Sequence, residues 1–261
     1  MSENILEINN LSKYFGGLAA VSDCSIKVKR GTITGIIGPN GSGKTTLFNL
    51  IAGNLKSSGG NVFFNNEKIT DVPSYELFSK GLLRTFQIAH EFTNLSVLEN
   101  LMMVPGNQSG EKLINTFLKP SLVAKEEELI KEKAKEVVEF LNLSHLSNEL
   151  AGNLSGGQKK LLELGRTMMV DAKLVLLDEV GAGVNRTLLK DLGSAIEKLN
   201  KEKGYTFCMI EHDMDFIGRL CDPVIVMAEG SVLFEGSVED AKKDERVIES
   251  YLGRGSKLKG N

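Results

Sequence analysis

Residues 38–45 are Gly38-Pro39-Asn40-Gly41-Ser42-Gly43-Lys44-Thr45, and they fill every fixed position of the pattern G-x-x-x-x-G-K-[ST]. The apolar, β-branched run Thr32–Ile37 before them is typical of a buried strand, and Thr45–Ala52 after them predicts a helix. This order places free backbone N–H groups in a glycine turn at a helix start, where the helix dipole also favours an anion. The sequence therefore predicts a phosphate-binding loop, with Lys44 on the β- and γ-phosphates and the Thr45 hydroxyl on Mg²⁺.

The rest of the chain also alternates between strand and helix patterns. Strands are predicted at Ile5–Ile8, Ser25–Val28, Val62–Phe64, Leu174–Leu177 and Tyr205–Ile210. A helix is predicted at Leu188–Leu199, and Glu229-Gly230 predicts a hairpin turn between Val224–Met227 and Val232–Phe234. Strands that alternate with helices in this way indicate an α/β fold with a parallel sheet.

The middle of the chain, from about residue 90 to residue 153, carries helical rather than strand periodicity. The clearest helix is predicted over Lys125–Leu141, and the charge run at its start is interpreted as a solvated helix face. Its apolar stripe is predicted to contain Leu129, Ile130, Ala134, Val137, Val138 and Leu141. The sequence thus predicts a nucleotide-binding core with an inserted helical subdomain.

Composition narrows the class of protein. The 261 residues carry a formal net charge of −3, with 25% charged and 41% hydrophobic residues, which is ordinary for soluble domains. No run approaches the roughly 18 apolar residues of a membrane-spanning helix, and the start MSENILEINN lacks the regions of a signal peptide. Cys24, Cys208 and Cys221 have no metal or redox spacing, which indicates reduced thiols in a cytoplasm. The near-neutral charge argues against nucleic acid as the default partner and leaves open only a local basic patch.

Two carboxylates, Asp178 and Glu179, follow the predicted strand Leu174–Leu177. In an open parallel sheet, ligands bind beyond the carboxyl ends of the strands, so both side chains are expected to face the phosphates. Asp178 is then the expected Mg²⁺ ligand, and Glu179 is placed to orient or deprotonate the attacking water. In isolation, the pair would be interpreted as a solvated strand end, and the phosphate loop makes the catalytic interpretation the stronger one.

A second glycine-rich segment, Leu154-Ser155-Gly156-Gly157-Gln158, precedes a helix predicted at Lys159–Met169. Its exposed backbone N–H groups, the Ser155 hydroxyl and the helix start together predict a second anion site. Taken alone, Ser-Gly-Gly is usually a loop or a linker.

Together, these motifs resemble those of the ATP-binding subunits of ABC transporters, over nearly the whole chain. In that family Gly38–Thr45 corresponds to the Walker A loop, Leu154–Gln158 to the signature and Leu174–Asp178 to the Walker B strand. The resemblance implies ATP and Mg²⁺ as cofactors and ATP hydrolysis as the activity. It implies a P-loop ATPase core with a parallel sheet, an N-terminal antiparallel β-subdomain and an inserted α-helical subdomain. The core is expected at residues 1–87 and 165–253, the helical subdomain with the signature at 88–164, and a flexible tail at 254–261.

The resemblance assigns three further residues. Gln87, in Arg84-Thr85-Phe86-Gln87, matches the glutamine that contacts Mg²⁺ and water and reports to the membrane subunits. His212 matches the histidine that contacts the γ-phosphate, and Phe15 matches the aromatic residue that stacks on adenine, with Tyr14 as the alternative. Taken singly, such residues more often have surface or packing roles, but their order and spacing relative to the three motifs favour the functional roles.

The implied site residues form three sets. The nucleotide-binding set is Phe15, Gly38, Pro39, Asn40, Gly41, Ser42, Gly43, Lys44, Thr45, Thr46, Ser155, Gly156, Gly157 and Gln158. The catalytic set is Lys44, Gln87, Glu179 and His212. The Mg²⁺-binding set is Thr45, Gln87 and Asp178.

The family resemblance also implies partners. Two ATP-binding subunits, identical or homologous, are expected to pair head to tail, with each ATP between Lys44 of one subunit and Ser155 and Gly157 of the other. The pair is expected to lie peripherally on the cytoplasmic face of the plasma membrane, bound to two membrane-spanning permease subunits. An extracytoplasmic solute-binding protein is expected as an indirect partner.

Four segments resemble, more narrowly, the larger ATP-binding subunit of bacterial branched-chain amino acid importers. They are Arg84–Ala89, Asn94–Asn100, Ala182–Asn185 and Val247–Gly253. Importers of urea or short amides share these segments and remain an alternative. A non-transport ABC ATPase acting on nucleic acid or ribosomes is disfavoured because the chain has one ATPase unit and a short insertion. A regulator that no longer hydrolyses ATP is disfavoured by the intact Lys44, Asp178, Glu179 and His212.

The segment after the expected base departs from the family pattern. The family usually reads Asp-Glu-Pro-Ala-Ala-Gly-Leu-Asn-Pro, whereas this chain has Val180 and Arg186 at the two proline positions and Gly181 after Val180. Loss of both prolines and gain of a glycine free the backbone directly after Glu179. This departure bears on how rigidly Glu179 is aimed and on how tightly the two ATP sites are coupled, but it removes no group that the chemistry needs.

Overall fold

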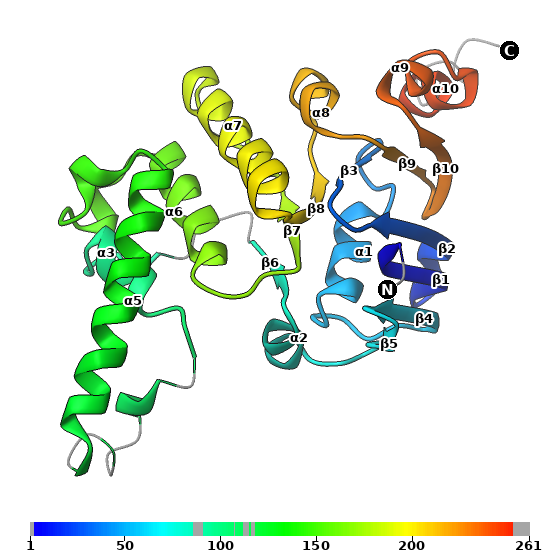
Figure 1. The fold of residues 1–261 in the computed structure, drawn as a ribbon. Coiled ribbons are helices and arrows are strands. Elements are labelled where there is room, and N and C mark those ends of the chain that lie inside the picture. Colours follow the sequence, from blue (N-terminus) through cyan, green and yellow to red (C-terminus); the bar gives the residue numbers. More distant parts are fainter. Residues whose placement is uncertain (1–2, 86–90, 107, 112–114, 116–117, 253–261) are drawn as a thin grey trace, which may run out of the picture. The chain divides into compact units, whose positions relative to one another are not determined.

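The structure is a computed structural model, and it describes residues 3–85, 91–106, 108–111, 115 and 118–252 (Figure 1). The chain divides into two compact units. The sheet unit comprises Met1–Arg84, Lys173–Gly181 and Ile196–Asn261, and the helical unit comprises Thr85–Ala172 and Ala182–Ala195. The tail expected at residues 254–261 lies outside the described residues.

In the part of the chain described, the sheet unit contains ten strands, five whole helices and the second half of α7 (Arg186–Lys203). The strands are β1 (Asn4–Phe15), β2 (Leu18–Lys29), β3 (Ile33–Ile37), β4 (Gly59–Phe64), β5 (Glu67–Lys68), β6 (Leu82–Arg84), β7 (Leu174–Asp178), β8 (Thr206–Ile210), β9 (Val224–Ala228) and β10 (Ser231–Gly236). The helices are α1 (Lys44–Ile51), α2 (Ser74–Lys80), α8 (Met214–Leu220), α9 (Val238–Ala241) and α10 (Glu245–Leu252).

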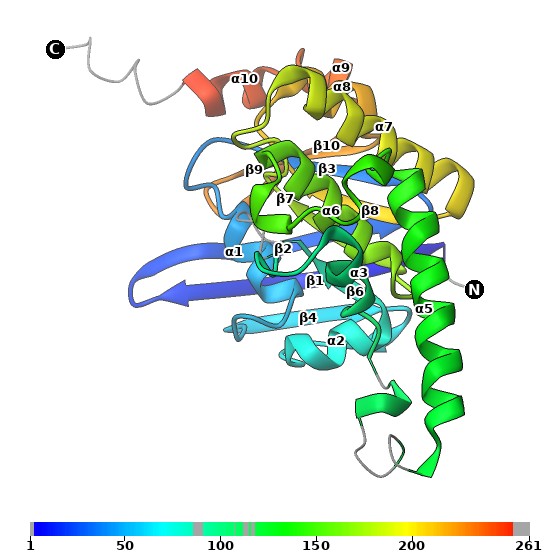
Figure 2. The same cartoon turned by 90° about the vertical axis from the view of Figure 1, so that its left-hand side faces the viewer.

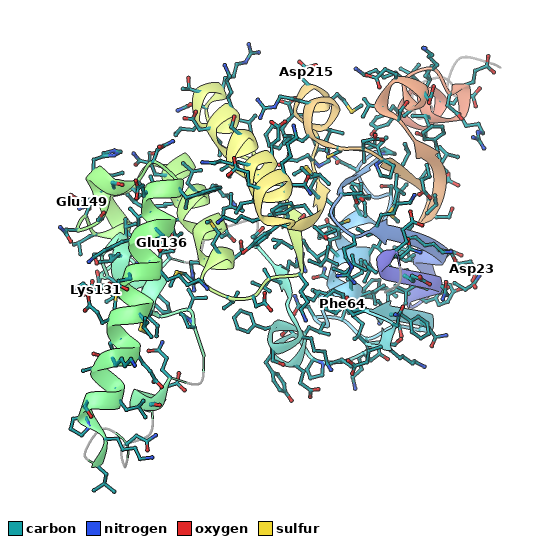
Figure 3. The ribbon with its side chains drawn as sticks, in the orientation of Figure 1. Asp23, Phe64, Lys131, Glu136, Glu149 and Asp215 are labelled. Carbon is teal, nitrogen blue, oxygen red and sulfur yellow. The ribbon has the colours of Figure 1, made fainter. Side chains whose placement is uncertain are left out.

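The strands form two sheets, as the α/β prediction requires. The larger sheet has the order β10-β9-β3-β8-β7-β6, and all neighbours in it run parallel except β10. The smaller sheet has the order β2-β1-β4-β5 and is antiparallel throughout (Figure 2). Leu47, Phe48 and Ile51 of α1 belong to the buried cluster that includes strands of both sheets. Phe64 of β4, labelled in Figure 3, is 2% exposed in the same cluster.

The first two strands are longer than their sequence pattern predicts. Each has 12 residues, whereas alternation predicted only Ile5–Ile8 and Ser25–Val28. The register of β1 against β2 shifts between Ile8 and Leu11, where Asn10 has a φ of 49° and its N–H bonds the Ser25 hydroxyl. This bulge interrupts the two-residue period, so the strand continues where the sequence pattern stops.

The predicted hairpin at Glu229-Gly230 is confirmed. β9 and β10 pair in antiparallel register across these two residues, whose φ values are 50° and 82°. Positive φ at both central positions is the geometry of a type I′ turn, which suits the twist of a two-residue hairpin.

The helical unit is built around α5 and α6. Its described elements are α3 (Val97–Met102), η1 (Ser109–Glu111), α5 (Pro120–Phe140), η2 (Ser144–Leu146), η3 (Ala151–Asn153), α6 (Gly156–Met168) and the first half of α7 (Arg186–Lys203). A side chain added at Gly165 of α6 would meet Leu141, Val137 and Leu101 within 3.2 Å. Gly165 therefore allows a close approach of α6 to α5 and α3. No helix in the described ranges is long and apolar enough to span a bilayer.

One residue of the predicted α5 stripe was wrong. Ala134, Val137 and Val138 are buried, but Leu129 is 58% exposed. At 100° per residue, Leu129 lies 140° around the helix from Ala134, so both cannot face the core. Figure 3 labels two charged side chains of this helix, Lys131 and Glu136.

The border between the units lies further along the chain than residue 164. Helix α6 is unbroken from Gly156 to Met168, and the helical unit runs to Ala172 and includes Ala182–Ala195.

Candidate functional site

The glycine loop joins β3 to α1, and its glycines are required by close backbone approaches. β3 is fully buried and ends at Ile37. A Cβ on Gly38 would lie 2.1 Å from the Met227 carbonyl oxygen, and one on Gly43 would lie 2.4 Å from that of Ala20. Both glycines also have positive φ, at 147° and 99°. The loop therefore follows a path that residues with side chains would obstruct.

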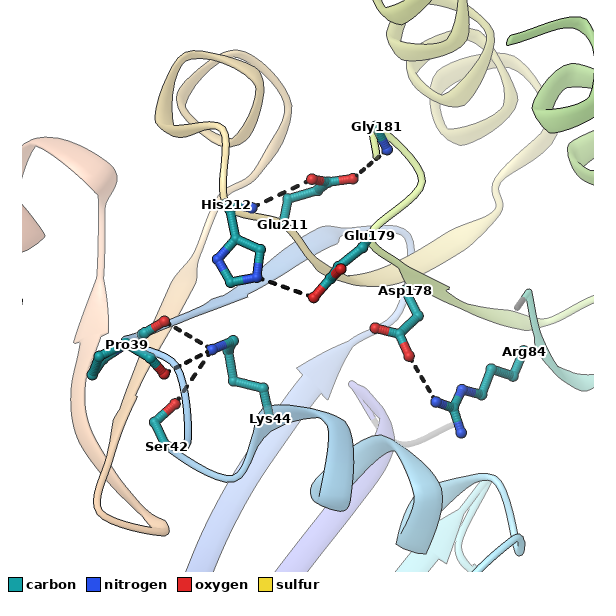
Figure 4. A network of polar contacts seen from close by, with 10 residues as sticks. Pro39, Ser42, Lys44, Arg84, Asp178, Glu179, Gly181, Glu211 and His212 are labelled. Atoms are coloured by element: carbon teal, nitrogen blue, oxygen red, sulfur yellow. Dashed lines mark hydrogen bonds and ion pairs between the residues drawn. The ribbon is translucent and has the colours of Figure 1, made fainter. Parts of the chain in front are cut away.

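Lys44 begins α1 and turns its side chain back into the loop (Figure 4). Its Nζ donates hydrogen bonds to the carbonyl oxygens of Gly38 at 2.8 Å and Pro39 at 3.0 Å. The residue is 6% exposed, and burial lowers the pKa of Lys44, while the charges of Glu179 and Asp178 oppose this shift. The ammonium therefore lies within electrostatic reach of both carboxylates predicted to serve the site.

A cavity of about 360 Å³ lies over the loop. It is lined by Phe15, Leu18, Ala19, Ala20, Asn40, Gly41, Gly43, Lys44, Thr45, Thr46, Glu179 and His212. Phe15 is 49% exposed, and the Lys13 ammonium lies 5.2 Å from its ring centre. Tyr14, the alternative aromatic, is absent from this lining. The cavity thus joins an apolar end at Phe15 to a polar end at the loop.

Glu179 and His212 meet at the polar end of the cavity. Glu179 Oε1 lies 3.0 Å from His212 Nε2, which is a hydrogen bond when the imidazole carries its proton on Nε2 (Figure 4). Glu179 has a φ of 49°, and its N–H donates to the Ile210 carbonyl at 2.9 Å. These two residues come from the ends of β7 and β8, which are parallel neighbours.

Asp178 is buried at the end of β7, with 2% exposure. Its Oδ2 accepts a hydrogen bond from Arg84 Nη2 at 2.7 Å, and Arg84 Nη1 bonds Asn49 Oδ1 at 2.6 Å. Asp178 Oδ1 is buried without a hydrogen-bond partner among the described residues. Arg84 had no predicted role. Arg84 reaches Asp178 because β6 lies beside β7 in the sheet. The sequence does not reveal this strand order, so it gives no signal for the pair.

Glu211 is a second functional candidate that sequence reasoning did not single out. It is 5% exposed, and its Oε1 accepts the Gly181 N–H at 2.7 Å. Its Oε2 accepts the N–H of His212 at 3.3 Å. Burial raises the pKa of Glu211, and the hydrogen bonds from these two N–H groups oppose the shift. The sequence motif matches its neighbour His212 and assigns no role to Glu211.

The second glycine segment lies in the helical unit, at the start of α6. Ser155 is the N-cap, and its hydroxyl accepts the Gln158 N–H while Gln158 Oε1 accepts the Ser155 N–H. The helix begins at Gly156, three residues before the predicted start, because this capping box ends the loop earlier. A Cβ on Gly157 would lie 2.5 Å from Leu188 of α7.

The structure therefore brings part of the expected site together. Phe15, Lys44, Thr45, Glu179 and His212 line one cavity in the sheet unit. The segment Ser155–Gln158 belongs to the helical unit. Gln87 lies outside the described residues.

Comparisons with known proteins point in one direction. Residues 21–182 match the family model described as ABC transporter. The chain is 45% identical over 249 residues to the probable branched-chain amino acid transport ATP-binding protein LivG of Archaeoglobus fulgidus, covering 95% of each chain. It is 35% identical over 253 residues to the high-affinity branched-chain amino acid transport ATP-binding protein BraF of Pseudomonas aeruginosa, covering 97% of this chain and 99% of that one.

One solved structure is similar to this chain in both sequence and fold. It is an ATP-binding cassette of an ABC transporter in its ADP conformation, 40% identical to this chain, with a TM-score of 0.83. The match covers 97% of this chain and 100% of that chain. The match therefore extends over both units of this chain.

Proposed function

Because the chain belongs to the ABC transporter family, as an ATP-binding subunit that hydrolyses ATP, we propose that it powers import of branched-chain amino acids or related solutes. The single observation that carries the solute class is the near-full-length similarity to two proteins named as branched-chain amino acid transport ATP-binding proteins.

The cavity of the sheet unit supports ATP binding. Backbone N–H groups of the loop and the α1 start are assigned to the phosphates, with Lys44 on the β- and γ-phosphates. Phe15, at the apolar end, is assigned to stack on adenine. The Lys44 ammonium would exchange its two carbonyl acceptors for phosphate oxygens, which carry more negative charge.

Mg²⁺ fits the residues at the end of β7. Asp178 Oδ1 is buried and unpartnered among the described residues, and Mg²⁺ prefers carboxylate oxygens. We assign the ion to Asp178 and the Thr45 hydroxyl, with Gln87 as the further ligand inferred from the sequence. When bound, the ion neutralises charge on the β- and γ-phosphates.

Hydrolysis is assigned to Glu179 and His212. Glu179 orients the attacking water and accepts its proton as the water oxygen bonds to the γ-phosphorus. His212, 3.0 Å from that carboxylate, is positioned to donate to a γ-phosphate oxygen when the nucleotide is present. Since the bond to ADP breaks as the new bond forms, the products are ADP and inorganic phosphate.

We assign Ser155, Gly156, Gly157 and Gln158 to the ATP held by a second subunit in a head-to-tail dimer. The start of α6 offers backbone N–H groups for a γ-phosphate. The Ser155 hydroxyl fixes this start by accepting the Gln158 N–H. ATP then stabilises the closed dimer, and hydrolysis releases it. Two membrane-spanning permeases would convert this cycle into transport on the cytoplasmic face, with a solute-binding protein outside.

Co-purification of the tagged chain from gently solubilised native cells tests this proposal. Two permease-like chains and a second ATPase are expected, and vesicles carrying the complex should take up leucine faster than urea or acetamide. The Glu179→Gln variant is the matched control, because it should co-purify with the same chains without powering uptake. Ribosomes, nucleic acid or only soluble partners would overturn the transport proposal, and preferred urea or amide uptake would overturn the solute class.

A further inference from the structure

The chain after Glu179 lacks two restraints that the family pattern supplies. Val180 and Arg186 stand where that pattern has proline, and Gly181 adds the most permissive backbone residue. Freedom at this point would spread the orientations of Glu179, although hydrolysis requires the base within hydrogen-bond reach of one water. Some other contact must therefore restrain this segment if the base is to be aimed.

The end of β8 supplies such contacts (Figure 4). The Ile210 carbonyl accepts the Glu179 N–H at 2.9 Å, and Glu211 Oε1 accepts the Gly181 N–H at 2.7 Å. The other oxygen of the Glu211 carboxylate accepts the N–H of His212 at 3.3 Å. One carboxylate thus connects the segment after the base to the backbone of the residue that bonds the base.

A packing role does not explain Glu211. The side chain is 5% exposed, and burying a carboxylate is costly unless its oxygens are hydrogen-bonded. Within the described residues, the Glu211 carboxylate accepts hydrogen bonds from two backbone N–H groups and from no cationic side chain. An apolar residue would pack at lower cost but could accept neither N–H group.

We propose that Glu211 is a positioning residue for ATP hydrolysis, which restrains Gly181 and His212 so that Glu179 and His212 stay in hydrogen-bonding register. The inference rests on the proposed function, because it assigns Glu179 as the base. Glu211 replaces, through a hydrogen bond, the restraint that proline gives by ring closure. Glu211 does not line the cavity assigned to the nucleotide, so it acts on turnover rather than on ATP affinity.

Kinetics of Glu211→Ala and Glu211→Gln test this role in the assembled transporter. Glu211→Ala is expected to lower kcat roughly tenfold or more, with KM and nucleotide Kd within about twofold of wild type, because only the aim of the base is lost. Glu211→Gln keeps an acceptor for Gly181 and should retain most of kcat. Restoring the family residues in Glu211→Ala, with Val180→Pro and Gly181→Ala together, should recover part of kcat. An unchanged kcat, or a loss confined to nucleotide affinity, would overturn the role.

Hydrogen–deuterium exchange gives a readout that does not depend on ATP turnover. Exchange over residues 179–185 should rise in Glu211→Ala at an unchanged Tm. Glu126→Ala is the matched control, because Glu126 accepts the N–H and the hydroxyl of Ser109, each at 2.8 Å, in the helical unit. It should leave both kcat and this exchange unchanged. Wild-type exchange over 179–185 in Glu211→Ala would contradict the positioning role even if the transported solute proved different, and a wild-type complex without ATPase activity would instead refute the proposed function.

Discussion

Glu179 has a φ of 49°, which non-glycine residues seldom adopt. Such a conformation costs of order 1–3 kcal/mol and persists where surrounding contacts hold it. Here the contacts are hydrogen bonds from the Glu179 N–H to the Ile210 carbonyl and from the Gly181 N–H to the Glu211 carboxylate. The strained residue is the one whose carboxylate lies 3.0 Å from His212, which associates the strain with the proposed catalytic pair.

Glu179→Gln tests the base directly. The amide keeps the size of the side chain but cannot accept a proton from water, so kcat for ATP should fall by about 10²–10⁴-fold. Nucleotide binding should persist, since phosphate contacts are assigned to Lys44 and the loop. Gel filtration with ATP should then show a longer-lived dimer than wild type, and wild-type turnover in this variant would refute the assignment.

Arg84→Ala tests the buried ion pair beside the proposed Mg²⁺ site. The side chains of Arg84 and Asp178 are 11% and 2% exposed, so removing the guanidinium leaves a carboxylate buried without its partner. The free energy of unfolding in urea should fall by about 3–5 kcal/mol. Lys29→Ala is the control, because its pair with Glu3 is 57% and 75% exposed and should change stability by less than about 1 kcal/mol. Equal effects of the two changes would contradict a structural role for Arg84.

The residues predicted from sequence are those whose place follows from a local rule. Asp178 and Glu179 follow a buried strand, and Lys44 follows a glycine loop. Arg84 and Glu211 do not follow such a rule, because their partners come from other strands. Only the order β8-β7-β6 brings Arg84 to Asp178 and Glu211 to Gly181, and that order is tertiary information.

At the scale of the element, the start of α6 carries a sharp prediction. A Cβ on Gly157 would lie 2.5 Å from Leu188 Cδ1 and 2.7 Å from its Cβ, whereas one on Gly156 would meet only the Gly183 carbonyl, at 3.8 Å. Gly157→Ala should therefore lower the free energy of unfolding by about 1–3 kcal/mol through overpacking. Gly156→Ala, one residue earlier in the same helix, should be neutral or stabilising. Chemical denaturation of both variants measures their free energies of unfolding. Equal values would contradict the prediction, because α7 would then accommodate the added methyl group without loss of stability.

Element types were predictable, but their limits were not. The strand β1 extends past a bulge at Asn10 that hides its period, and α6 starts at a capping box rather than at the first long side chain. The stripe of α5 failed at Leu129, because adjacent apolar residues were counted on one face. In each case a local contact or the angular position on the helix decided the outcome, and the pattern of apolar residues does not reveal either.

At the scale of the whole molecule, strand direction explains why the site forms. β8 pairs in parallel with β3 on one side and with β7 on the other. The carboxyl ends of these three strands lead into the glycine loop, the two carboxylates and the histidine. The prediction of a ligand site at strand ends needed only the parallel fold. The division into units needed the structure, because residues 182–195 return to the helical unit after β7.

The three cysteines report on the integrity of the sheet unit. All are free and buried, and burial raises the pKa of Cys24 and of Cys208 to about 12 and raises the pKa of Cys221 as well. At pH 8 the native protein should therefore contain almost no thiolate and should react with a disulfide reagent only as fast as it unfolds. In denaturant all three thiols should react at once, and prompt reaction of the native protein would contradict this burial.

The same shifts make stability depend on alkaline pH. Because the folded pKa lies above the ordinary value of 9.0, the folded state binds more protons than the unfolded state as the pH rises from 9 toward 12. The stabilisation that comes from keeping these thiols protonated is fully present below pH 9. As the pH rises from 9 toward 12, the free energy of unfolding should fall by up to about 1.4 kcal/mol per thiol for each pH unit. Urea titrations at pH 8, 9 and 10 measure this slope. Replacing Cys24, Cys208 and Cys221 together by alanine should flatten it, because alanine has no proton to lose, and an unchanged slope would assign the alkaline loss to other groups.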